Sequence, residues 1–243
     1  MIPENTKYVQ NAAFYYNDMQ GNDIVISHNT DASIINAFMY VKNIGKIWIF
    51  DTPNYKLKVL SNSFNNVSTY DEQPLHFDSF YIPENCKISR CFSVNHGITI
   101  DNLYFPGIFD NTGYSSEIFN TAPVVTNIYL PDTITDSFYV NAKGINIWNI
   151  SDIITTQYMN TVTQNKDLVK SVHFKPGTKA LYYSICSNMV NLKTVEFADS
   201  IEEIKEGCFY GCVNADISVM PRNIKYIRGN AFANCLNIKS LNL

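Results

Sequence analysis

Histidine and cysteine are the side chains that most often carry acid–base, nucleophilic or metal chemistry. This chain has four histidines and six cysteines. His76 lies two residues before Asp78, a spacing that allows an acid–base pair. The segment around them is polar, which favours a solvated loop instead. The remaining histidines, His28, His96 and His173, belong to no metal-binding or nucleophile motif.

The cysteine spacings predict neither a metal site nor a disulfide framework. Cys86 and Cys91 approach the spacing of zinc ligands, as do Cys208 and Cys212, but no second pair with matching His or Cys spacing accompanies them. Cys212 and Cys235 are 23 residues apart, and each closes an F-x-x-C pattern. Equivalent positions of successive repeats stack, so these two cysteines are predicted to be small buried core residues.

The sequence contains no motif of a known catalytic or cofactor site. G-x-S-x-G, the P-loop and G-x-G-x-x-G are all missing. We therefore predict a protein that is not an enzyme and needs no cofactor. The net charge of -4 and the lack of a Lys/Arg cluster argue against nucleic acid as a partner. No apolar run is long enough to insert into a membrane, and the first residues do not form a secretory signal.

The elements that must position any site are short apolar triplets that return about every 23 residues. Within a triplet the two flanking residues are apolar and the middle one usually differs, which is the two-residue period of a strand with one buried face. Proline follows several triplets and ends the strand. The strands are predicted at residues 24–26, 47–49, 80–82, 103–105, 128–130, 145–147, 172–174, 195–197, 217–219 and 241–243.

Two irregularities interrupt this period. The step from Ile49 to Ile82 is 33 residues, so we expect an insertion loop within residues 51–79, which include a polar stretch rich in Asn and Ser. The steps on either side of Ile147 are 17 and 27 residues, and together they equal two ordinary repeats. The spacing therefore leaves the register of the strand at Ile147 open.

The last third of the chain carries a more specific signature. Residues 201–219 read IEEIKEGCFYGCVNADISV, and residues 224–243 read IKYIRGNAFANCLNIKSLNL. They resemble the BspA-like class of leucine-rich repeats, closely from about residue 168 to residue 243 and through the strand-plus-proline element upstream.

The resemblance implies an α/β solenoid, a right-handed leucine-rich-repeat superhelix of about ten repeats that forms a single domain over residues 1–243. One parallel β-sheet is expected on one face, with turns and short helices on the other, because parallel strands need crossover connections. The Asn ladder of other leucine-rich repeats is not evident in the sequence.

The middle residue of each triplet is predicted to point away from the core. Aromatic rings from successive strands would then lie about 4.8 Å apart on the open face of the sheet. Large, stiff side chains of this kind are typical of binding surfaces; the alternative is cross-strand packing that only stabilises the sheet. The candidate partner-binding residues are Trp48, Tyr81, Tyr104, Tyr129, His173 and Glu196.

These features predict a non-catalytic protein-interaction or structural module of a larger assembly, such as a phage virion or tail. The chain starts and stops in mid-repeat, and uncapped strand edges invite pairing, so protein partners or further copies of the chain are expected at its ends. A surface adhesin that binds a host protein or a glycan is the alternative, and an enzyme is a further one. The lack of an export signal favours the assembly over the cell surface.

Overall fold

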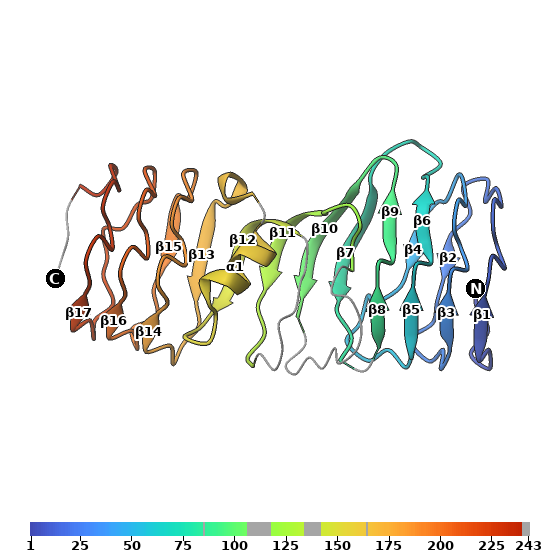
Figure 1. Ribbon diagram of the computed structural model, residues 1–243, viewed down its shortest axis with the longest axis horizontal. Helices are drawn as coiled ribbons and strands as arrows, with labels where there is room; N and C mark the ends of the chain where they lie inside the picture. Colours follow the sequence, from blue (N-terminus) through green and yellow to red (C-terminus); the bar gives the residue numbers. More distant parts are fainter. Residues whose placement is uncertain (85, 106–117, 134–141, 164, 240–243) are drawn as a thin grey trace. The chain divides into compact units, whose positions relative to one another are not determined.

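The computed structural model describes the chain except for residues 85, 106–117, 134–141, 164 and 240–243 (Figure 1). The strands pair in parallel with strands about one repeat away: Ile24 faces Ile47, and Leu75 faces Ile98, each 23 residues further on. The predicted parallel solenoid is confirmed. The chain divides into two compact units, one of Met1–Val125 with Thr135–Ala142 and one of Thr126–Ile134 with Lys143–Leu243.

Short strands on three sides of the coil build the first unit. One four-stranded sheet contains β1 (Tyr8–Gln10), β3 (Ser33–Ile35), β5 (Val59–Ser61) and β8 (Lys87–Ser89). The paired strands on the other sides are β2 (Ile24–Val25) with β4 (Ile47–Trp48), β7 (Leu75–Tyr81) with β10 (Ile98–Tyr104), and β6 (Phe64–Val67) with β9 (Phe92–Val94). Strands therefore occupy positions at which the sequence predicted only turns or short helices.

A ladder of phenylalanines fills the core of the first unit. The rings of Phe14, Phe38, Phe64 and Phe92 stack nearly parallel, with successive centroids 4.8, 5.0 and 5.3 Å apart. Each ring comes from a different coil, so the ladder joins successive coils through their equivalent positions.

The predicted insertion loop at residues 51–79 contains regular structure, because β5, β6 and most of β7 lie within it. The coil-to-coil pairing shows where extra length is accommodated. Ile44 forms a parallel bridge with Thr69, and the amide of Tyr81 donates to the carbonyl of Phe50 over 2.6 Å. Residues 69–81 thus run between the same two contacts as the shorter segment 44–50 of the preceding coil. Between these contacts the longer segment moves away from the shorter one. A single domain over residues 1–243 stays a prediction.

The second unit has one longer sheet and one row of short strands. The longer sheet contains, in order, β11 (Val124–Tyr129, most of which lies in this unit), β12 (Lys143–Ile150), β13 (Ser171–Phe174) and β15 (Thr194–Glu196). The short strands are β14 (Ala180–Leu181), β16 (Glu203–Ile204) and β17 (Tyr226–Ile227). The helices of the described residues are α1 (Thr156–Val162) and the 3-10 turn η1 (Lys166–Leu168).

The register of β12 differs from the sequence prediction. Ile147 faces Val172, but after an irregularity Ile150 faces Phe174, and Asn149 between them has a left-handed φ of 62°. Ile150, not Ile147, is therefore the residue equivalent to Phe174. The sequence period missed this shift because an irregular residue inside a strand advances the chain without advancing the coil.

An Asn ladder is present, contrary to the sequence analysis. Asn191, Asn214 and Asn237 follow one another at 23-residue intervals. Each side-chain amide donates to a backbone carbonyl of the preceding coil, over 3.0, 2.8 and 3.2 Å respectively. These bonds satisfy carbonyl groups in turns that no strand ladder reaches.

Of the two F-x-x-C cysteines, which were both predicted to be buried, Cys212 lies in the core and Cys235 is only partly buried. Cys212 is fully buried, and its Sγ lies 3.0 Å from the carbonyl oxygen of Cys186, while Cys235 makes the equivalent 3.0 Å contact with Phe209 and is partly exposed. Burial raises the pKa of the Cys212 thiol to about 12. The pKa of Cys208 is also raised well above its ordinary value by burial.

These environments predict selective thiol reactivity. The thiolate is the reactive form, so at pH 8 iodoacetamide is expected to modify Cys235 first and to leave Cys208 and Cys212 unmodified while the protein is folded. Peptide mass spectrometry over a time course measures the order of modification, with guanidinium-unfolded protein as the control in which all three react. Modification of Cys208 as fast as Cys235 in the folded protein would contradict the buried ladder.

Candidate functional site

The outward residues Tyr81 and Tyr104 form a stacked pair at the ends of β7 and β10. They face each other in the strand register, and their rings lie 4.3 Å apart at an interplanar angle of 7°. Both side chains are half-buried. The predicted aromatic contact between successive strands therefore occurs in the first unit.

Trp48 points outward from β4 and is 37% exposed. Its Nε1 donates to Asp23 of the preceding coil over 2.9 Å, and the ammonium of Lys46 lies 5.4 Å from the ring centroid. Among the described residues no ring contact joins Trp48 to Tyr81. The indole is thus held in place by polar contacts, while its outer surface stays accessible to solvent.

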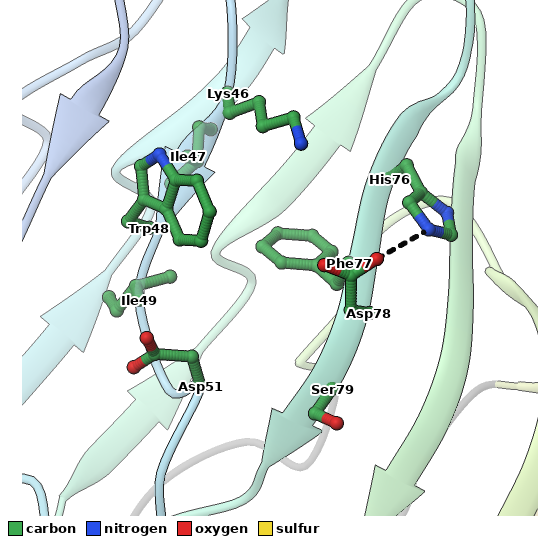
Figure 2. A pocket seen from close by; sticks show the side chains of 9 residues that line it. All are labelled: Lys46, Ile47, Trp48, Ile49, Asp51, His76, Phe77, Asp78 and Ser79. Carbon is green, nitrogen blue, oxygen red and sulfur yellow. Dashed lines mark hydrogen bonds and ion pairs between the residues drawn. The ribbon is translucent and has the colours of Figure 1, made fainter.

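A small pocket opens beside Trp48, where β4 and β7 separate (Figure 2). Lys46 and Trp48 line it from β4 and the residue before it, and the side chains of His76 and Asp78 lie on the β7 side. Asp51 also lines the pocket. The pocket therefore combines an aromatic wall with charged groups of both signs.

His76 and Asp78 lie on a strand, not in the solvated loop that the sequence favoured. In β7 the residues Leu75 and Phe77 are buried, so His76 and Asp78 share the outward face. His76 Nε2 lies 3.2 Å from an oxygen of Asp78 and 3.6 Å from an oxygen of Asp101 on β10. The structure thus adds a second carboxylate, that of Asp101, to the predicted pair.

The second unit has its own outward ring stack. The Trp148 ring lies between Tyr129 and His173, with centroid distances of 5.9 and 3.5 Å and interplanar angles of 18° and 8°. Tyr129 and His173 were predicted to line the open face, but Trp148 was missed. The predicted triplet ended at Ile147, which made Asn146 the outward residue. The apolar residue Ile150 was the signal that the strand continues and that Trp148 points outward instead.

Hydrogen bonds hold the ring stack in the second unit. The Trp148 Nε1 donates to Asn127 over 3.3 Å. His173 Nε2 is hydrogen-bonded to the Ser171 hydroxyl over 2.9 Å, and Nδ1 lies 2.8 Å from a carboxylate oxygen of Glu196. Because an ionised carboxylate only accepts, Nδ1 carries the proton and donates it. His173 is almost fully buried and Glu196 is exposed, so the stack ends in a solvent-facing negative charge.

The six predicted residues therefore fall into separate groups within the two units. Tyr81 and Tyr104 form one pair, while Trp48 stands apart from them at its pocket. Tyr129, His173 and Glu196 belong to one connected cluster, which Trp148 completes. Their role in binding a partner stays a prediction.

The helices in the described part of the chain are too short to cross a membrane.

No curated protein and no solved structure shows significant similarity to the chain. Residues 132–243 match the family model of the BspA type leucine-rich repeat region, in six copies. The match begins at residue 132, upstream of residue 168, where the close resemblance in the sequence begins. It includes the turns that carry the Asn ladder and the cysteine positions. Residues 132–243 are therefore similar to the BspA type leucine-rich repeat region, which supports the resemblance that the sequence signature indicated.

Proposed function

We propose that this protein is a non-catalytic interaction module that binds a partner protein through outward side chains of its strands. The observation that carries the proposal is the Tyr129–Trp148–His173 stack with Glu196 at its end. BspA-type leucine-rich repeats also suggest a role in protein interaction or adhesion.

Fixed aromatic side chains suit a binding surface for a physical reason. Ordering a side chain on binding costs about 0.5–1.5 kcal/mol, and much of that cost is avoided for rings that are already stacked and hydrogen-bonded. Trp148 is held on both faces by rings and at Nε1 by Asn127. Trp48 is held by Asp23 and Lys46. Each unit therefore presents one tryptophan, a residue enriched in binding hot spots, in a fixed orientation.

These outward side chains fit two biological settings. We propose a structural component of a larger assembly, such as a virion or tail, as the first, and a surface adhesin as the second, which the family match favours. Isolation of the native, untagged protein with whatever it binds distinguishes them. A defined multi-protein particle supports the assembly, whereas recovery with host matrix protein or glycan supports the adhesin.

The two tryptophans test the interaction surface directly. Trp48→Ser and Trp148→Ser are made separately, and binding to the partner identified by co-purification is measured by titration calorimetry. We expect at least one of them to weaken binding by about tenfold or more, the loss typical of a hot-spot side chain. Tyr8→Ser is the control, because Tyr8 is highly exposed but lies on the separate sheet of β1.

Urea denaturation of each variant separates lost contact from lost structure. Unchanged affinity in both tryptophan variants, with the fold intact, would remove the proposed surface. An equal loss of affinity in Tyr8→Ser would place the contact elsewhere on the molecule.

A further inference from the structure

We propose that the outward face of β7 and β10 binds a divalent transition-metal cation of the zinc class through His76, Asp78 and Asp101. Each of the three residues offers one ligand atom, and these atoms lie within 4.8 Å of one another. The atoms closest to His76 Nε2 are Asp78 Oδ1 and Asp101 Oδ2. One imidazole nitrogen and two carboxylate oxygens form a ligand set that Zn²⁺ accepts.

The spacing of these atoms fits a metal centre without movement of the strands. Zinc–nitrogen and zinc–oxygen bonds of about 2.0–2.2 Å place neighbouring tetrahedral ligand atoms about 3.4 Å apart. His76 Nε2 lies 3.2 Å from Asp78 Oδ1 and 3.6 Å from Asp101 Oδ2, on either side of that value. The 3.6 Å distance to Asp101 is too long for a good hydrogen bond. A proton on Nε2 would therefore bond Asp78 and leave Asp101 without a hydrogen bond from His76.

The strand register creates the site from residues of two coils. His76 faces Thr99, and Phe77 faces Ile100, so Asp78 comes opposite Asp101. The alternation that buries Phe77 and Ile100 turns the polar residues of both strands to the same outward face. The backbone ladder between β7 and β10 therefore fixes the positions from which the three ligand side chains project.

Two further contacts favour a cation at this point. His76 Nδ1 lies 3.0 Å from the Thr99 hydroxyl, the kind of outer contact that orients a metal-binding imidazole and leaves Nε2 for the metal. Asp78 and Asp101 are like charges opposite each other on neighbouring strands, an unfavourable arrangement. Among the described residues neither carboxylate has a Lys or Arg ion-pair partner, and Lys46 in the adjoining pocket lies over the Trp48 ring instead. A bound cation would neutralise this repulsion.

Three protein ligands leave a coordination position for an outside group, as in zinc sites that keep a fourth position open. The position would be filled by water in the isolated chain and by a carboxylate or imidazole of a bound molecule in a complex. The inference does not depend on the proposed interaction surface, because the isolated chain is tested without any partner.

Titration calorimetry of the metal-stripped full chain with Zn²⁺ tests the site. We expect one saturable site per chain, and His76→Ala, Asp78→Asn and Asp101→Asn should each weaken Zn²⁺ binding by about tenfold or more. His96→Ala and Asp152→Asn are the matched controls, since both residues are exposed and lie outside the cluster. Their affinity should equal that of the unsubstituted protein.

Trp48 supplies a second readout that locates the ion. It lines the same pocket as His76 and Asp78, and Trp148 is the chain's other tryptophan. In a Trp148→Phe background, Co²⁺ is expected to quench Trp48 fluorescence saturably, and His76→Ala should abolish that quenching. Absence of saturable Zn²⁺ binding would overturn the proposal, as would binding that persists unchanged in a folded His76→Ala/Asp101→Asn double variant.

Discussion

Replacing Phe64 with alanine is expected to lower the free energy of unfolding by about 3–5 kcal/mol, the range for deleting a fully buried aromatic ring. Phe64 is 0% exposed, and its ring stacks between Phe38 and Phe92, with centroids 5.0 and 5.3 Å away. Alanine would remove both stacking contacts and leave a cavity that the neighbouring rings cannot fill without leaving their own positions.

The solenoid architecture increases the consequence of this loss. In a repeat protein each coil is stabilised mainly by its two neighbours, so one missing rung weakens two interfaces. Urea unfolding followed by circular dichroism measures the effect. Tyr8→Ala is the control, because Tyr8 is 71% exposed and its removal should change stability by no more than about 0.5 kcal/mol. A Phe64→Ala variant as stable as this control would show that the phenylalanine ladder does not join the coils.

Gly45→Ala is the second substitution expected to have a large effect. A Cβ added to Gly45 would lie 2.4 Å from the carbonyl oxygen of Gly21 and 2.6 Å from a carboxylate oxygen of Asp23. Both groups belong to the preceding coil, and the closer one is backbone, which cannot rotate away. We expect a loss of about 1–3 kcal/mol or more from overpacking.

The same substitution should disturb Trp48. Asp23 accepts hydrogen bonds from the Lys46 amide over 2.8 Å and from the Trp48 indole over 2.9 Å, so moving its carboxylate releases the ring. Fluorescence of Trp48 in a Trp148→Phe background reports this change. We expect the Trp48 emission maximum to shift in Gly45→Ala.

Gly229→Ala is the matched control for Gly45→Ala. An added Cβ there meets nothing within 4 Å, and the backbone is not left-handed. Alanine at such a position reduces the entropy of the unfolded chain and typically adds about 0.4–1 kcal/mol of stability. Equal stability of the two variants in urea would show that the coils can move apart at Gly45 without cost.

The repeating core could be predicted from the sequence because each coil buries its inward residues against equivalent residues of its neighbours. Ile24 facing Ile47 and the F-x-x-C positions of Cys212 and Cys235 follow directly from that requirement. The Asn ladder at Asn191 and Asn214 has the same period but was not predicted. In a chain so rich in Asn, the residue type alone does not show which side chains bond the neighbouring coil.

The candidate sites were less predictable, because they depend on local departures from the period. Trp148 joins the ring stack because Ile147 faces Val172 and not Phe174, an offset in register that the irregularity at Asn149 makes up before Ile150. Trp48 borders a pocket because residues 69–81 take a longer path than residues 44–50. Neither the backbone conformation of one Asn nor the path of an insertion is encoded in the spacing of apolar residues.

The sequence by itself determined that this protein is a parallel solenoid with outward-facing middle residues, because burial on one face imposes a two-residue period within strands and a fixed period between them. Only the tertiary structure decided which outward residues meet. His76 and Asp78 share a face because side chains alternate along a strand. Asp101 joins them only through the register in which β10 pairs with β7, and the spacing of apolar residues along one strand does not reveal that register.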